Sequence, residues 1–94
     1  MSIPALYATE SIPLKEKTAH EHWVFPACNF HWLIAEINPK EKLAFGWAFL
    51  NDEQNAEWGY ISIAELQGIG AVRDANFAPK KASEAINEIL REVK

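Results

Sequence analysis

Two segments rich in aromatic and β-branched residues, separated by a turn that contains proline, constrain the fold of this chain most strongly. The first spans residues 30–37 and the second spans residues 42–50, with Pro39 in the turn between them. Aromatic and β-branched residues favour strands, and proline at the second position of a turn already has the φ that the turn needs. The pattern therefore predicts an antiparallel hairpin.

The predicted hairpin sorts its side chains into two unlike faces, because side chains along a strand point alternately to opposite sides. With Ile37 opposite Lys42, the pairing places Trp32 opposite Trp47. The expected bulky face consists of Phe30, Trp32, Ile34, Leu43, Phe45, Trp47 and Phe49. The expected small-residue face consists of His31, Leu33, Ala35, Ala44, Gly46, Ala48 and Leu50. A register shift of one residue would mix the two sets.

The segments on either side of the hairpin predict further strands and a short helix. Residues 22–25 are aromatic and β-branched and precede a proline, which indicates an edge strand. Residues 57–61 predict a third strand, antiparallel to the second. This strand is expected to run straight into a short helix from Ile63 to about Gln67, because Ser62 and Glu65 form a capping box and Gly68 and Gly70 stop the helix.

A second helix is predicted after Pro79, because apolar residues recur there at the helical period. The stripe consists of Ala82, Ala85, Ile86, Ile89, Leu90 and Val93. Such a helix is marginal alone and is expected to dock on the sheet or on a partner. At the other end of the chain, residues 1–20 predict an extended arm with one short strand or turn, in which residues 15–17 are a solvated charge run.

These elements together predict a single small α+β domain over residues 1–94. It would contain an antiparallel meander sheet of three to four strands, one short helix and a C-terminal amphipathic helix packed on the sheet. A chain of this length has room for one core only.

The charge balance narrows the class of partner. Nine basic and thirteen acidic residues give a formal net charge of −4, so neither direct nucleic-acid binding nor a polybasic membrane anchor is expected. A single cysteine cannot form an internal disulfide. No signal peptide and no apolar run long enough for a membrane span is evident. We therefore expect a cytoplasmic protein.

Several short motifs occur in an order that is similar to that of one bacterial family. They are Leu6-Tyr7-Ala8-Thr9-Glu10, Ile12-Pro13-Leu14, Asn29, Trp32 and Glu36 in the first hairpin strand, Phe45-Gly46, Trp58-Gly59-Tyr60, Ser62-Ile63-Ala64-Glu65-Leu66, Val72-Arg73-Asp74 and Phe77-Ala78-Pro79. Over residues 6–79 this set resembles the uncharacterised family known as domain of unknown function 2958. Members of that family are often met on plasmids, phages and other mobile elements. The resemblance implies the architecture and a mobile-element context, and it supplies no mechanism, cofactor or catalytic residue.

Histidines and the cysteine are the first candidates for chemistry. His20 and His22 would share a face of a strand and could bind a metal if His31 or Cys28 supplied a third ligand. The sequence contains no complete metal-binding motif, so a packing or surface pair is the favoured interpretation and no metal or cofactor is expected. Cys28 is followed by no helix that would activate it as a nucleophile, so no catalytic residue is assigned.

Charged residues near the hairpin give a second candidate. Glu36 is expected on the bulky face, at the turn end of the hairpin, where a lone buried charge would be costly. Arg73 can bind a carboxylate through two parallel hydrogen bonds, and Asp74 follows it. The functional interpretation is an acidic and guanidinium pocket for a small ligand or for hydrolysis. The structural interpretation, an ion pair that ties the Arg73 segment to the sheet, is favoured.

Aromatic side chains of the sheet, among them Trp58 and Tyr60, are interpreted first as core. Stacking on single-stranded bases would need interleaved Lys or Arg, which the sequence lacks between Lys17 and Lys40. Aromatic residues left exposed on a sheet would instead make binding sites for another protein.

The leading hypothesis is a small, non-enzymatic accessory protein that acts by binding another protein in a mobile-element setting. Its candidate binding residues are Glu36, Trp58, Tyr60, Arg73 and Asp74. Two alternatives stay open: a small hydrolase-like enzyme that uses the Glu/Arg/Asp pocket, and an acidic protein that acts on a nucleic-acid-binding partner. The sequence is also compatible with a homo-oligomer.

Overall fold

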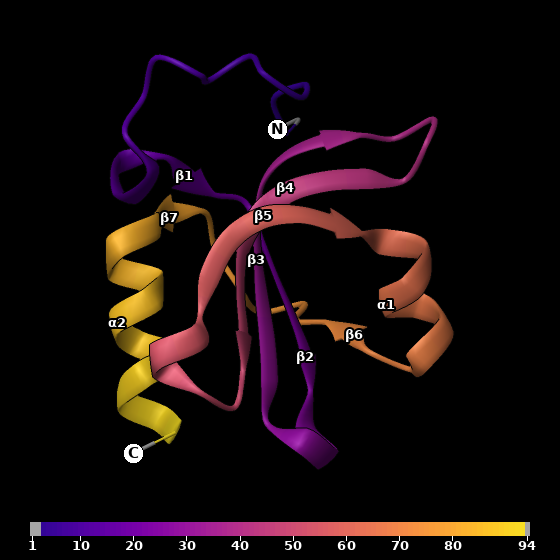
Figure 1. Cartoon of the computed structure of the whole chain (residues 1–94), viewed down its shortest axis with the longest axis vertical. Helices are drawn as coiled ribbons and strands as arrows, with labels where there is room; N and C mark the ends of the chain where they lie inside the picture. Colours follow the sequence, from indigo (N-terminus) through magenta and orange to yellow (C-terminus); the bar gives the residue numbers. More distant parts are fainter. Residues whose placement is uncertain (1–2, 94) are drawn as a thin grey trace.

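The computed structural model describes residues 3–93 of the chain, which form two antiparallel sheets and two α-helices (Figure 1). The larger sheet has the strand order β5-β4-β3-β2-β6, with β2 (Glu21–Phe25), β3 (Phe30–Asn38), β4 (Leu43–Leu50), β5 (Glu57–Ser62) and β6 (Val72–Arg73). The smaller sheet pairs β1 (Thr18–Ala19) with β7 (Lys80–Lys81). The helices are α1 (Ile63–Ile69) and α2 (Ala82–Val93), and the short 3-10 helices are η1 (Leu14–Glu16), η2 (Pro26–Cys28) and η3 (Glu53–Asn55).

The predicted α+β class is confirmed, and an antiparallel meander runs through β2, β3, β4 and β5. One further strand, β6, follows α1 in the chain and pairs with the outer side of β2. The prediction that residues 22–25 form an edge strand is therefore wrong, because β6 covers that edge. Neither helix in the described part of the chain has the length and the apolar run that a membrane crossing needs.

The hairpin of β3 and β4 forms as predicted, but the residues next to the turn pair with different partners from those expected. Ile37 pairs with Ala44 and not with Lys42. The change moves the register by two residues, which leaves each side chain near the turn on its expected side. Glu36 accordingly pairs with Phe45 and shares its face.

A single β-bulge in β3 reverses the rest of the predicted sorting. The register shifts between Ile34 and Glu36, and an extra residue in one strand turns all following side chains to the opposite face. Trp32 consequently pairs with Ala48, and Trp47 lies on the other side of the sheet. The prediction of one bulky face that carries both tryptophans is wrong, and each face has its own large aromatic residues.

The two helices cover opposite faces of the sheet (Figure 1). The face under α1 has a core of Trp23, Trp32, Ile34, Ala44, Ile61, Ile63, Leu66 and Ala71. The face under α2 has a core of Ala19, Leu33, Trp47, Phe49, Ala85 and Ile89. The predicted stripe of α2 thus docks on the sheet through Ala85 and Ile89. The side chain of Val93, which the sequence placed in the same stripe, lies outside the described residues.

The start of α1 follows the predicted capping box, whereas the helix continues through Gly68 to Ile69, two residues beyond the expected end at about Gln67. Ser62 Oγ accepts the backbone N–H of Glu65 at 3.2 Å, which is the N-terminal half of a capping box. Gly70 ends the helix with a φ of 90°, a left-handed conformation that glycine adopts without strain. Because β5 runs directly into α1, this cap fixes where the outer strand of the sheet ends.

Candidate functional site

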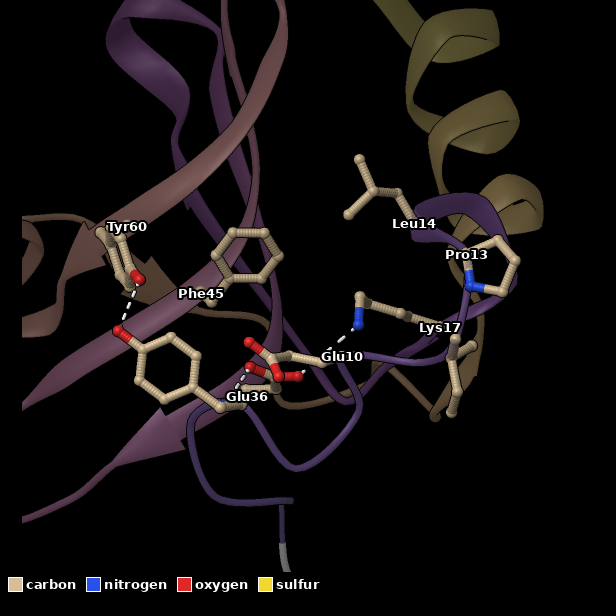
Figure 2. Close-up of a pocket in the computed structure, with 9 residues that line it drawn as sticks. Glu10, Pro13, Leu14, Lys17, Glu36, Phe45 and Tyr60 are labelled. Carbon is tan, nitrogen blue, oxygen red and sulfur yellow. Dashed lines mark hydrogen bonds and ion pairs between the residues drawn. The ribbon is translucent and has the colours of Figure 1, made fainter.

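A cleft of about 420 Å³ opens between the N-terminal arm, residues 3–17, and the sheet (Figure 2). We call it the arm cleft. Its lining residues are Tyr7, Glu10, Ile12, Pro13, Leu14 and Lys17 from the arm, Glu36 from β3, Phe45 from β4 and Tyr60 from β5. Most of these side chains are apolar or aromatic, as is usual for a pocket that holds a ligand or a partner's side chain.

Glu36 holds the arm against the sheet. Its Oε1 accepts the backbone N–H of Tyr7 at 2.8 Å, and its Oε2 accepts the backbone N–H of Thr9 at 3.1 Å together with the Thr9 hydroxyl. Lys17 Nζ lies 3.6 Å from Oε2 and also donates to the carbonyl and hydroxyl oxygens of Thr9. One buried carboxylate therefore binds two backbone groups and one cation of the arm.

This arrangement keeps Glu36 ionised at neutral pH. Burial alone raises the pKa of a carboxyl group. The hydrogen bonds from Thr9 and from the backbone of Tyr7, together with the Lys17 charge, outweigh that effect and hold the pKa of Glu36 below its usual value. With its oxygens occupied by the arm, the carboxylate acts as a fixed structural anion and is poorly suited to donate a proton to a substrate.

Aromatic rings form the opposite wall of the arm cleft. The hydroxyl groups of Tyr7 and Tyr60 lie 2.7 Å apart, and the Tyr60 ring meets the Phe45 ring edge-on at a centroid distance of 5.8 Å. Tyr60 remains 57% exposed. An exposed aromatic ring beside an open cleft supplies contact area without loss of much side-chain freedom, which favours a role in binding.

Two of the five predicted binding residues, Glu36 and Tyr60, line the arm cleft. Trp58 lies next to it, stacked on the Phe45 ring at a centroid distance of 6.0 Å. Arg73 is exposed on β6, at the opposite edge of the sheet. Asp74 lines a different cavity. The structure therefore separates the predicted Glu/Arg/Asp pocket, and the expected partner of Glu36, Arg73, is replaced by Lys17.

Asp74 belongs to a second polar cluster, on the sheet face under α2. His22 Nδ1 lies 3.4 Å from Asp74 Oδ2, and His22 Nε2 lies 2.9 Å from His31 Nδ1. A carboxylate only accepts hydrogen bonds, so the contact with Asp74 is a hydrogen bond when His22 carries a proton on Nδ1. His31 Nε2 in turn lies 3.2 Å from Asn29 Oδ1. Every ring nitrogen of the pair thus has a neighbour within the protein, which favours the packing interpretation.

Burial has the largest effect on the pKa values of His22 and His31. It lowers the pKa of His22 more than the bond to Asp74 raises it, and burial together with the His22 charge lowers the pKa of His31. Both rings are therefore neutral at neutral pH. Cys28 is exposed in η2. Within residues 3–93, no group of three or more His, Cys, Asp or Glu residues is arranged to hold a metal ion.

Three residues that surround Glu36 in the arm cleft or beside it were not identified from the sequence. Lys17 belongs to a segment expected to be a solvated charge run, yet only 4% of it is exposed. Tyr7 and Thr9 bind Glu36 through their backbone N–H groups, which no side-chain pattern reveals. The one available signal was the need of Glu36 for a cation, and that need does not say which cation.

Comparisons of the chain with protein-family models, with curated proteins and with solved structures find no match.

Proposed function

We propose that this chain is a non-enzymatic accessory protein that acts by binding another protein, with the arm cleft as its recognition site. One observation carries the proposal. The cleft is open, its walls are apolar and aromatic, and the two buried charges that line it, Lys17 and Glu36, neutralise each other. Such a pocket favours a partner's apolar side chain, because burying it costs no further desolvation of Lys17 or Glu36.

The placement of the ionisable residues supports binding over hydrolysis. A hydrolase that used Glu36, Arg73 and Asp74 would need all three around one substrate. Glu36 and Asp74 line different cavities, and Arg73 lines neither of them. The carboxylate of Glu36 already accepts hydrogen bonds from the arm and stays ionised beside Lys17, which disfavours it as a proton donor to a bound molecule.

The mobile-element setting is part of the same proposal, and its support is the resemblance of the ordered motifs to the family described above. Two of those motifs, Tyr7 with its neighbours and Trp58-Gly59-Tyr60, contribute to the arm cleft or flank it. A partner encoded by, or targeted by, a mobile element would meet the protein there.

Affinity capture with a matched pair of variants tests the proposal. Tagged protein is incubated with extract of the cells that produce it, beside Leu14→Asp in the arm cleft and Val72→Asp on β6. Leu14 and Val72 are 43% and 54% exposed, so the two changes place the same charge on comparable surfaces. We expect a protein that the wild type and Val72→Asp retain and that Leu14→Asp loses. Capture of no specific protein, or equal capture by Leu14→Asp, would contradict the proposal.

A further inference from the structure

The outer edge of β5 is unprotected. β5 ends the strand order of the larger sheet, so no strand within residues 3–93 pairs with its outer edge, and Figure 1 shows β5 at the front of the molecule. The strand Glu57–Ser62 pairs with β4 in one continuous register and contains no proline and no lysine. Proteins usually protect an edge of this kind with proline, lysine or a bulge, because its free backbone groups pair readily with another strand.

The backbone groups that point outward from β5 can be assigned from one hydrogen bond. The N–H of Ile63 donates to the carbonyl of Lys42 at 2.8 Å. Pairs in an antiparallel ladder alternate between hydrogen-bonded and non-hydrogen-bonded. Gly59 and Ile61 are therefore bonded to β4, and the N–H groups of Trp58, Tyr60 and Ser62 face outward. The C=O groups of Trp58 and Tyr60 face outward as well, whereas the C=O of Ser62, the N-cap of α1, accepts the first bond of that helix.

A cleft lies along β5 on each face of the sheet. On one face is the arm cleft. On the other is a groove of about 370 Å³ beside α1, which we call the helix groove; its lining includes Leu50, Ile61, Leu66 and Ile69. Leu50 and Ile69 are about half exposed, and Tyr60 lines both spaces. Successive side chains of a strand point to opposite faces, so a strand added to β5 would direct alternate side chains toward the two clefts.

The charges around β5 indicate a basic occupant. Glu10, Glu57 and Glu65 are exposed around the two clefts and the strand, and none of the three forms an ion pair within the described residues. Lys17, the cation that lines the arm cleft, is committed to Glu36. A second copy of this chain, with its net charge of −4, would place its own carboxylates opposite those of the first copy, and the like charges would repel. Its arm and α1 would also meet the walls of both clefts.

We infer that β5 receives an extended, basic segment of a partner protein as an added antiparallel or parallel strand. Its backbone pairs with Trp58, Tyr60 and Ser62, and its alternate apolar side chains enter the arm cleft and the helix groove. In this mode the backbone bonds give affinity and the two clefts give sequence preference. The inference rests on the proposed protein-binding function and names the form of the ligand that the site takes.

Selection of short random peptides displayed on phage, against the full folded chain, supplies the probe. We expect enriched peptides to alternate apolar residues with lysine or arginine, and their synthetic forms to bind more weakly as salt is added. Amide hydrogen exchange of the free protein should be slow at Gly59 and Ile61 and fast at Trp58, Tyr60 and Ser62. The bound peptide should slow exchange at the latter three.

A matched pair of variants locates the contact. Ile69→Asp in the helix groove should weaken peptide binding by about tenfold or more, as loss of one buried contact does. Val72 is an aliphatic residue on β6 with an exposure similar to that of Ile69, and Val72→Asp should leave the affinity for the peptide unchanged.

Three outcomes would overturn the inference. One is the absence of any enriched peptide. Another is a bound peptide that leaves the amides of Trp58, Tyr60 and Ser62 in fast exchange. The third is protection of those amides in the free protein through formation of a dimer. In each case the proposed function stands if a cellular partner is still lost with Leu14→Asp, so the two failures are distinguishable.

Discussion

Lys17 Nζ lies 3.6 Å from Glu36 Oε2, and each of these two side chains is only 5% exposed. The two residues come from the N-terminal arm and from β3, the central strand of the larger sheet, so their ion pair helps to join the arm to the sheet. Removal of water from both charges is offset by the bonds that Thr9 and the backbone of Tyr7 add. This pair, together with the backbone bond from Ile37 to Pro4, holds the arm over the sheet and so forms the arm cleft.

Replacement of Lys17 by methionine should destabilise the protein strongly. It leaves the buried Glu36 carboxylate without its cation, a change that costs about 3–5 kcal/mol in comparable sites. Lys80→Met is the matched control, because Lys80 pairs with Glu88 at 2.9 Å on an exposed surface, where such pairs contribute about 0–1 kcal/mol. Urea denaturation of both variants measures the difference. Equal losses would show that the Lys17 pair is not buried.

Gly46→Ala should be far more damaging than Gly59→Ala, although the two glycines are direct partners on β4 and β5. A Cβ at Gly46 would lie 1.8 Å from the carbonyl oxygen of Leu33, whereas a Cβ at Gly59 meets nothing within 4 Å. We expect Gly46→Ala to cost about 3 kcal/mol or more and Gly59→Ala to be neutral or to stabilise by about 0.5–1 kcal/mol. Thermal unfolding of the two variants decides; a tolerated Gly46→Ala would contradict the close approach of β3.

Acidification should destabilise the protein in two stages. The pKa values of His22 and His31 are lower in the folded state than the ordinary value of 6.5, so the unfolded chain binds more protons as the pH falls below 6.5 and the free energy of unfolding decreases. Burial lowers the pKa of His20 as well, with the same sign. The pKa of Glu36 is lower than its ordinary 4.5, so its contribution is present above that pH and is lost as the pH falls further.

Urea denaturation at a series of pH values measures this dependence. The double variant His22→Gln/His31→Gln should show a shallower fall below pH 6.5, while retaining the later loss that comes from Glu36. A free energy of unfolding that stays constant or rises on acidification through this range would be the opposite of the expected sign.

Ile89→Ala should reveal how firmly α2 is docked. Ile89 is 4% exposed and packs in the core with Trp47 and Leu33, and its truncation should cost about 2–5 kcal/mol. Ile69→Ala is the same chemical change at a residue that is 50% exposed in α1, and it should cost much less. Chemical denaturation of both variants provides the comparison, and similar costs would indicate that α2 does not bury Ile89.

Local signals in the sequence predicted the elements well. The hairpin, the cap at Ser62 and the stripe of α2 each depend on a few adjacent residues, and each appears in the structure. Of the two glycines expected to stop α1, Gly70 does so, whereas Gly68 lies inside the helix. The prediction that Trp32 and Trp47 share a face is wrong because β3 contains a β-bulge. No residue in β3 indicates this bulge in the sequence. The prediction that β2 is an edge strand is wrong because β6, which is far from β2 in the sequence, pairs with it.

The candidate site was predictable in part. The cost of a buried carboxylate identified Glu36 as a residue in need of a cation, and the aromatic pattern singled out Tyr60. The choice of Lys17 over Arg73 depends on how the arm folds back over the sheet, and that path is set by backbone hydrogen bonds such as the one from Ile37 N–H to the Pro4 carbonyl at 2.9 Å. Side-chain patterns carry no information about such bonds.

Amide hydrogen exchange at Tyr7 and Thr9 tests most directly whether the arm is held in place and the cleft is formed in the free protein. Both N–H groups donate to the Glu36 carboxylate, at 2.8 and 3.1 Å. We expect both to exchange much more slowly than the amides of an unstructured chain. Exchange at the unstructured rate would mean that Glu36 does not hold the arm, and that the cleft on which the proposed function depends is absent.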